Sequence, residues 1–219
     1  MKRKTLALVH TSSTLVPVFE RLFKEKKLDV NLVHIEDASL IKDVIADGEL
    51  TADISHRVMQ HLTDAENTAA DYIMVTCSSL GPAVDEAHKR LHKPIIRIDQ
   101  PLADRAVSLG SKIGVVATLM TTLVPTTQLI QRRAVKVSKE IEIVTELCEG
   151  AFKALADGDL ERHDAEVIHA IKKLTNKVDV VVLAQASMAR IVSQFNAKEV
   201  RVPVLSSPAL AVDYLAHVL

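Results

Sequence analysis

The chain has 219 residues, of which 48% are hydrophobic and 25% charged, and its 27 basic side chains nearly balance its 28 acidic ones. This composition is typical of a globular protein with one large or two small domains, and it lacks the basic surplus that indicates nucleic-acid binding. Aromatic residues make up 3% and tryptophan is absent, which argues against base-stacking platforms and aromatic carbohydrate clefts and leaves the core to Val, Leu, Ile and Ala.

The first residues bear a weak likeness to a signal peptide, because the basic residues 2–4 precede an apolar run at 5–9. The run is short, His10 interrupts it, and no small-residue cleavage site precedes Pro17, so we expect no cleaved leader. No segment approaches the ~20 apolar residues that a membrane span needs, so we expect no membrane association. Two cysteines are too few for a disulfide framework, which predicts a cytoplasmic protein with reduced thiols.

Short β-branched runs alternate with longer segments of helical spacing along the first half of the chain. This alternation predicts a parallel sheet covered by helices, whose strands are buried on both faces and therefore form continuous apolar runs. In chain order we expect a strand at 5–9, a helix at 14–26, a strand at 30–35, a helix at 50–70, a strand at 72–75, a helix at 82–91 and a strand at 94–98.

The same alternation begins again beyond residue 110, so the predicted fold class is α/β throughout. In chain order we expect a strand at 112–117, a helix at 125–133, an extended segment at 141–144, a helix at 164–176, strands at 178–183 and 202–205, and a helix at 209–219.

The second half repeats the first at a constant offset, which places position 185 on position 77. The segment SSTLVP at 12–17 matches MTTLVP at 120–125, and IMVTCSSL at 73–80 falls on VVLAQASM at 181–188. Proline and two apolar residues at 94 and at 203 agree to within one position. Agreement in spacing across three landmarks indicates an internal repeat.

The repeat predicts two pseudo-symmetric lobes, each with a parallel sheet flanked by helices, and an active-site cleft between them. We expect the first lobe at 1–107, carrying Cys77, and the second at 108–205, carrying Gln185. The C-terminal helix at 206–219 is expected to pack back on the lobes.

Polar side chains gather where four of the predicted strands end. In parallel α/β sheets ligands bind beyond the carboxyl ends of the strands, and the helices that follow offer free N–H groups and a partial positive charge. The sequence therefore predicts a hydroxyl-lined site for an anionic small molecule, formed by Thr11, Ser12 and Ser13, by Ser78 and Ser79 around Cys77, by Thr118 and Thr121, and by Gln185 and Ser187.

Cys77 is the predicted reactive residue of this site. A thiol near a helix N-terminus is expected to have a lowered pKa, which suits a nucleophile or a proton carrier. The alternative is that Cys77 is only a small buried hydrophobe, as free cysteines usually are. Cys148 lies away from the predicted strand ends, and we expect it to be structural.

Other titratable residues leave alternatives open. His10 stands at a strand end and either contacts the ligand or makes structural hydrogen bonds. Arg97 and Asp99 follow the fourth strand, as an ion pair or, for Arg97, as a partner of an anionic ligand. No His/Cys spacing matches a metal site, and the chain carries neither a phosphate-binding glycine motif nor a GxSxG serine-hydrolase motif.

Three segments together resemble the aspartate/glutamate racemase superfamily, which includes hydantoin racemases, maleate isomerases and arylmalonate decarboxylases. These segments are TCSS at 76–79, ATLMTT at 117–122 and VLAQASM at 182–188. The resemblance covers nearly the whole chain, and it is more specific for the superfamily than for any substrate.

The resemblance implies a cofactor-independent mechanism in which one cysteine on each side of the substrate α-carbon removes or returns a proton. Cys77 matches the cysteine of the first lobe, whereas the second cysteine is replaced by Gln185. An amide cannot exchange a proton as a thiol does, so this departure favours single-cysteine chemistry over two-thiol racemisation. Gln185 is then expected to bind a substrate carboxylate or amide.

We therefore expect an isomerase or decarboxylase that acts on a small carboxylate or a cyclic amide, with no cofactor and no metal. The alternative is a non-catalytic binding protein with a degenerate racemase-like cleft. The expected partner is the small-molecule substrate, without nucleic acid or membrane. A homodimer is common in the group, and the sequence leaves the oligomeric state open.

Overall fold

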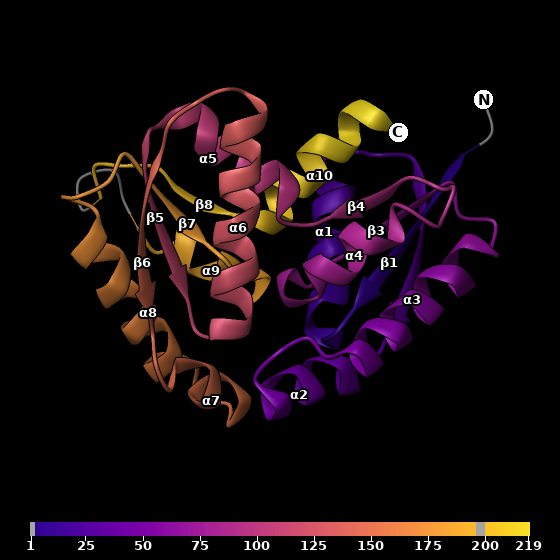
Figure 1. Ribbon diagram of the computed structural model, residues 1–219, viewed down its shortest axis with the longest axis horizontal. Coiled ribbons are helices and arrows are strands. Elements are labelled where there is room, and N and C mark those ends of the chain that lie inside the picture. The colour runs from indigo at the N-terminus through magenta and orange to yellow at the C-terminus, as the bar shows by residue number, and fades with distance from the viewer. Residues whose placement is uncertain (1–2, 196–199) are drawn as a thin grey trace. The chain divides into compact units, whose positions relative to one another are not determined.

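The computed structural model describes residues 3–195 and 200–219 of the chain, which divides into two compact units (Figure 1). The first unit comprises Met1–Ile98 together with Pro208–Leu219, and the second comprises Asp99–Ser207. Both are α/β units with a four-stranded parallel sheet, as the sequence predicts. No helix in the described part of the chain is long and apolar enough to span a membrane.

The sheet of the first unit has the strand order β2-β1-β3-β4, and all three pairings are parallel. Leu6 of β1 lies beside Leu32 of β2 and Tyr72 of β3. The strands are β1 (Lys4–His10), β2 (Val30–Glu36), β3 (Tyr72–Val75) and β4 (Ile95–Arg97), each within a few residues of its predicted position.

Helices α3 and α4 cover one face of this sheet and α1 the other (Figure 1). The helix α2 was not predicted; it begins at the capping residue Asp37, whose side chain accepts a hydrogen bond from the Ser39 N–H, and ends at Gly48 in the left-handed conformation. The helices of the unit are α1 (Val16–Glu25), α2 (Ala38–Asp47), α3 (Ala52–Glu66), α4 (Gly81–Ala87) and α10 (Ser207–Val218).

Alternating side chains of the first sheet enter cores on its two faces. Ala7 and Val9 of β1 and Val75 of β3 pack with the apolar side chains of α2, α3 and α4, and all are essentially inaccessible to solvent. Leu6 and Leu8 point the other way and are also fully buried. This burial on both faces explains why the strands appear in the sequence as unbroken apolar runs.

The second unit repeats this topology with the order β6-β5-β7-β8. Helix α8 covers one face of its sheet, and α5 and α6 cover the other (Figure 1). The elements are α5 (Gln100–Leu109), β5 (Lys112–Ala117), α6 (Met120–Lys136), β6 (Glu142–Leu147), α7 (Ala151–Ala156), α8 (Leu160–Leu174), β7 (Val180–Leu183), α9 (Ala189–Val192) and β8 (Val204–Ser206).

The spacing of equivalent elements reproduces the offset found in the sequence. Both ends of β7 follow the ends of β3 at the offset that relates Gln185 to Cys77, and both ends of α8 follow those of α3 in the same way. The same holds for two short 3-10 turns, Ser78–Leu80 after β3 and Ala186–Met188 after β7. The expected pair of topologically equivalent lobes is therefore present.

The final helix of each repeat belongs to the unit built mainly by the other repeat. Helix α5, which follows β4 of the first sheet, contacts α6, β7 and β8 of the second unit. Helix α10, which follows β8, belongs to the first unit, where the Tyr72 hydroxyl donates to the carbonyl of Val218 at 2.8 Å. Residues 99–107, placed in the first lobe from the sequence, thus lie in the second unit.

Candidate active site

In the first unit, Thr11 and Cys77 come together at the carboxyl end of the sheet. Thr11 directly follows β1, and Cys77 follows β3 by two residues. Both continue the sheet face that carries Val9 and Val75, because side chains two positions apart along a strand point the same way. The predicted clustering of polar side chains at this edge is therefore realised within the unit.

Hydrogen-bond donors surround the sulfur of Cys77. The residue has extended backbone angles (φ −121°, ψ 114°) and stands at the N-cap position of the turn Ser78–Leu80, where its backbone carbonyl accepts from the Leu80 N–H at 3.2 Å. The backbone N–H groups of Ser79 and Leu80 and the hydroxyls of Thr11 and Ser79 lie near enough to the sulfur to favour its thiolate form, although the Cys77 side chain makes no capping hydrogen bond to the turn. This cradle fits a thiolate formed during a reaction.

The resting state of Cys77 is nevertheless the protonated thiol. The residue is partly exposed, but protein atoms surround its sulfur closely enough that desolvation raises the thiol pKa above its usual value, against the lowering effect of the four nearby donors. The expectation of a lowered pKa was wrong, because desolvation of the sulfur outweighs the donors around it. Cys77 therefore suits a proton donor better than a resident nucleophile.

His10 takes part in a structural network below the cysteine. Its imidazole is fully buried, with Nδ1 2.8 Å from the Thr76 hydroxyl and Nε2 2.8 Å from Nδ1 of His34. The two rings stack with centroids 5.1 Å apart. Desolvation by burial, and then the neighbouring His34, lower the pKa of His10 to about 4, so it is neutral at pH 7. Of the two roles left open for His10, the geometry supports the structural one.

The remaining candidates of the first unit differ in exposure. Ser78 and Ser79 are buried beside Cys77, and Thr11 is buried as well. Ser12 is partly exposed and Ser13 is exposed; they stand at the start of a short 3-10 turn (Ser13–Leu15), with the Ser12 hydroxyl 2.8 Å from that of Thr14. None of the contacts between described side chains joins Ser12 or Ser13 to the cysteine.

The second unit holds Gln185 at the position equivalent to Cys77. Gln185 has φ −119° and ψ 137° and caps the turn Ala186–Met188, as Cys77 caps its own turn. Its Oε1 accepts hydrogen bonds from the backbone N–H of Thr118, at 2.7 Å, and from the Thr118 hydroxyl, at 2.9 Å. Thr118 directly follows β5 as Thr11 follows β1, so a threonine hydroxyl contacts the capping residue in both units.

These contacts fix the orientation of the Gln185 amide. The backbone N–H of Thr118 can only donate, so the atom facing it must be Oε1, and Nε2 must point the other way. Gln185 is 9% exposed, and among the described residues Nε2 has no hydrogen-bond partner. The second unit thus presents an oriented N–H donor at the position equivalent to the thiol of the first unit.

Thr121 and Ser187 lie at the same edge of the second sheet. Thr121 is in the first turn of α6, which has no side-chain cap, and its buried Oγ1 lacks a hydrogen-bond partner within residues 3–195 and 200–219. Ser187 is partly exposed, and its backbone carbonyl accepts from Arg190 at 2.6 Å. Both hydroxyls are available to a ligand.

Beside this turn, Arg190 and Asp164 were not singled out from the sequence, whereas the charged neighbours of His163 favoured a solvated surface position that the structure contradicts. Arg190 pairs with Asp164 on α8 at 2.5 Å, and Asp164 lies 2.8 Å from Nδ1 of the fully buried His163. His163 continues the apolar stripe of α8 through Val167 and Ile171, and that spacing could have indicated its burial. The Arg190–Asp164 contact joins two helices, and no local pattern announces it.

Cys148 and Arg97 have structural surroundings. Cys148 is buried in an apolar cluster with its sulfur 3.8 Å from the carbonyl of Glu166, and burial, followed by the acidic neighbours Glu146 and Glu166, raises its pKa to about 11. The Arg97 guanidinium is 2% exposed and donates to Asp85 at 2.8 Å.

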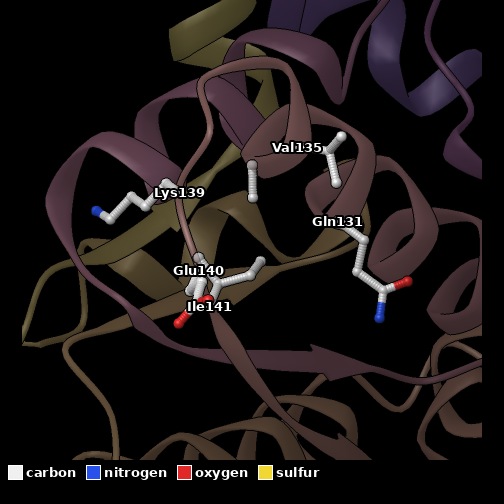
Figure 2. A pocket seen from close by; sticks show the side chains of 6 residues that line it. Gln131, Val135, Lys139, Glu140 and Ile141 are labelled. Atoms are coloured by element: carbon white, nitrogen blue, oxygen red, sulfur yellow. The ribbon is translucent and has the colours of Figure 1, made fainter.

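A surface hollow of the second unit lies away from these residues. A shallow pocket of about 550 Å³ is bordered by the end of α6 and the segment before β6, and Figure 2 shows Lys139 extending from it on the side opposite Gln131. It lies near the amino end of β6, whereas Thr118 and Gln185 stand at the carboxyl edge, so we do not assign it to the site. No group of three potential metal-ligating side chains occurs among the described residues.

Comparison with known proteins places this geometry in context. The family model for Asp/Glu/Hydantoin racemase matches residues 9–215. No curated protein sequence matches significantly. A glutamate racemase isoform from Bacillus anthracis superposes with a TM-score of 0.76 at 16% identity, covering 100% of this chain and 82% of that one. An aspartate racemase from Picrophilus torridus superposes with a TM-score of 0.76 at 15% identity, covering 99% of this chain and 94% of that one. An allantoin racemase from Klebsiella pneumoniae superposes with a TM-score of 0.66 at 15% identity, covering 99% of this chain and 87% of that one. The family match confirms the resemblance drawn from the sequence.

Proposed function

The chain belongs to the Asp/Glu/Hydantoin racemase family, and from this premise we propose that it is a cofactor-independent enzyme in which Cys77 exchanges a proton with one face of a small carboxylate or cyclic amide. Isomerisation, or decarboxylation followed by protonation, fits a single thiol better than racemisation does. We also propose that the protein works in the cytoplasm, and a homodimer is the oligomeric state that the group favours.

The observation that carries this proposal is the protonated thiol in a cradle of donors. Burial keeps the proton on Cys77 in the free protein, so the thiol is ready to act as a general acid. When the proton passes to the substrate carbon, the sulfur becomes a thiolate, and the N–H groups of Ser79 and Leu80 and the hydroxyls of Thr11 and Ser79 then stabilise the new charge. The same thiolate can remove a proton in the reverse direction.

Gln185 supports one-sided chemistry. Its Nε2–H points away from Thr118 and is free to donate to a substrate oxygen, where negative charge develops when the carbon is deprotonated or loses carbon dioxide. An amide is far too weak an acid and base at neutral pH to exchange a proton with carbon, so Gln185 cannot serve the opposite face as a second thiol would. The expected product is therefore a single stereoisomer.

The substrate class follows from the donors at the two turns. Hydroxyls and backbone N–H groups, with Thr121 and Ser187 among them, suit a carboxylate or an amide oxygen. The solved structures with this fold include proteins described as glutamate, aspartate and allantoin racemases. We therefore place the substrate among amino-acid-like carboxylates and hydantoin-like rings, without choosing between them.

The test is proton exchange at carbon in deuterium oxide. A panel of aspartate, glutamate, allantoin, maleate and arylmalonate is incubated with the protein, and mass spectrometry and chiral chromatography record deuterium uptake, carbon dioxide loss and stereochemistry. The wild type is expected to deuterate one face, and Cys77→Ala to lose at least about 100-fold of the rate. Full activity in Cys77→Ala would refute the assignment.

Thr11→Val provides the matched variant, because it keeps the shape of the side chain and removes one donor to the sulfur. It is expected to raise the thiol pKa further and to shift the pH dependence of alkylation by iodoacetamide to higher pH, since each pKa unit changes the thiolate fraction tenfold. Thr14→Val removes a hydroxyl that contacts Ser12 instead, and it should leave the alkylation profile unchanged.

A ligand-binding protein without catalysis is the second candidate, and the replacement of the second thiol by Gln185 is what favours it. Calorimetry on the same panel separates the two. A compound that binds without deuterium uptake in wild type, and binds equally to Cys77→Ala, would establish the binding role.

A further inference from the structure

The turn that carries Gln185 has little helical support. It leads into α9, which spans four residues, whereas the equivalent turn after Cys77 leads into α4, which spans seven. A helix of four residues makes few backbone hydrogen bonds and does not fix the chain that precedes it. A side-chain interaction must therefore hold this turn if the Gln185 amide is to keep one orientation.

Arg190, which lies in α9, supplies this interaction through its guanidinium. Its Nη1 donates to the carbonyl of Ser187 at 2.6 Å, which ties the guanidinium to the turn. Its Nη2 and Nε donate to the carboxylate of Asp164 on α8, at 2.5 and 3.2 Å. This bidentate ion pair between Arg190 and Asp164 therefore links the turn to α8, a helix of fifteen residues whose apolar face is buried.

Asp164 is itself held in place. Burial alone would raise the pKa of its carboxyl, but hydrogen bonds from His163 and Gln194 and the charge of Arg190 lower it, so the carboxylate is ionised at neutral pH. His163 is fully buried, with its Nδ1 2.8 Å from Asp164, and the Gln194 amide donates to Asp164 at 3.0 Å. The carboxylate side chain is 15% exposed, so solvent screens the pair only in part.

The first unit has no copy of this arrangement. At the offset that relates Gln185 to Cys77, Arg190 corresponds to Pro82 and Asp164 to His56, and neither can form the pair. The Arg190–Asp164 ion pair, called the clamp from here on, is therefore specific to the turn in which glutamine replaces the thiol. A thiol needs only proximity to its donors, whereas an amide has to present one particular N–H in one direction.

We propose that Arg190 and Asp164 are positioning residues that hold the 185–188 turn so that the Gln185 amide donates to the substrate oxygen. The inference rests on the proposed function for the role of Gln185, but the clamp itself is measurable without substrate. The amide proton of Thr118 donates to Gln185 Oε1, so its exchange with solvent reports how long that side chain stays in place.

The experiment measures hydrogen exchange of the Thr118 amide by NMR in Asp164→Asn and Arg190→Lys. Asn keeps the size of Asp164 without its charge, and Lys keeps the charge of Arg190 without the fork. Both are expected to speed Thr118 exchange at least about tenfold relative to amides in the centre of β5. Asp164→Glu, which keeps the carboxylate, is expected to restore part of the protection.

The matched control is Asp104→Asn, which breaks another forked ion pair of the same unit, between Asp104 on α5 and Arg133 on α6. It is expected to lower Tm by a similar amount and to leave Thr118 exchange unchanged. Unchanged Thr118 exchange in both clamp variants, or an equal acceleration of all β5 amides, would overturn the proposal.

The panel assay then separates the clamp from the reaction. On a compound that the wild type turns over, Arg190→Lys should lower kcat with little change in KM, because the donor acts on charge that develops in the transition state. A rise in KM with an unchanged kcat would contradict the positioning role. If no compound is turned over, the proposed function fails, and the Thr118 exchange still decides whether the clamp exists.

Discussion

The residues at the two N-cap positions, Cys77 and Gln185, share a backbone conformation and a threonine neighbour, but they interact differently with that threonine. At Cys77 the threonine hydroxyl donates to a sulfur that burial keeps protonated. At Gln185 both threonine donors are taken up by Oε1, and the outward group is Nε2–H. One position thus offers a transferable proton and the other a fixed donor, which is the chemical basis for expecting one-sided proton transfer.

His10 gives the molecule a measurable response to acid. Its pKa is lowered from 6.5 to about 4, so between these values the unfolded chain binds a proton that the native state excludes. The free energy of unfolding should therefore fall as the pH falls through this window, by about 3 kcal/mol from this group. His10→Gln removes the titration, so the difference between the variant and wild type should shrink from pH 7.5 to pH 4.5 in urea unfolding.

The control for this prediction is His88→Gln, because His88 is exposed. Its stability should follow the wild type at every pH. A His10→Gln variant whose unfolding free energy parallels the wild type across the window would show that His10 is protonated in the native state as readily as in the unfolded one.

The positions of individual site residues were predictable, but their properties were not. Thr11, Cys77, Thr118 and Gln185 follow buried strands, and strand ends are visible in the sequence as the ends of apolar runs. The direction of the Cys77 pKa depends on how densely three elements surround the sulfur, which no local pattern encodes. The same holds for the Arg190–Asp164 pair, whose members lie 26 residues apart on different helices.

At the scale of elements, the turn after Cys77 is packed against β4. Gly81 opens α4, and a Cβ built there would lie 2.2 Å from Nη2 of Arg97. The guanidinium is 2% exposed and bound to Asp85, so it has little room to move aside. The glycine is required by this close approach and not by its backbone, because its φ of −50° is helical.

Gly81→Ala is therefore expected to destabilise the protein by about 1–3 kcal/mol, although alanine is the better helix former. The added methyl group should also shift the Cys77 turn and change the rate of alkylation of its thiol. Thermal unfolding and iodoacetamide kinetics measure the two effects. Gly81→Ala combined with Arg97→Gln shortens the obstructing side chain and should recover part of the alkylation rate; a single variant as stable as wild type would contradict the packing argument.

Element prediction succeeded for the strands and missed four helices, α2, α5, α7 and α9, of which α2 and α5 have ten residues each. The eight strands of the described chain carry β-branched apolar runs that distinguish them locally, and all fall near the expected positions. Helices α7 and α9 have six and four residues, too few for a periodic pattern to form. Helix α2 was missed because its apolar face rests on few residues, Leu40 and Val44 among them.

At the scale of the whole molecule, the repeat organises the fold and relates the two candidate site positions, Cys77 and Gln185. The two sheets share one strand order, and the equivalent strands β3 and β7 and turns keep a constant offset in sequence. The unit boundary is the one aspect that the repeat does not show, since α5 and α10 each join the unit built by the other repeat.

The repeat also predicts what a restored thiol would do. In Gln185→Cys the introduced sulfur would stand in the backbone conformation of Cys77, beside the hydroxyl and N–H of Thr118. It should react with iodoacetamide faster than the buried Cys148, whose pKa is raised to about 11 and which accepts none of these donors.

On a compound that the wild type deuterates on one face, the Gln185→Cys variant should deuterate both faces, because a second acid and base then serves the other face. Ser187→Cys, two residues along and outside the capping position, provides the control and should add a reactive thiol without the second stereoisomer. Equal product mixtures from the two variants would mean that the symmetry of the fold does not extend to the chemistry.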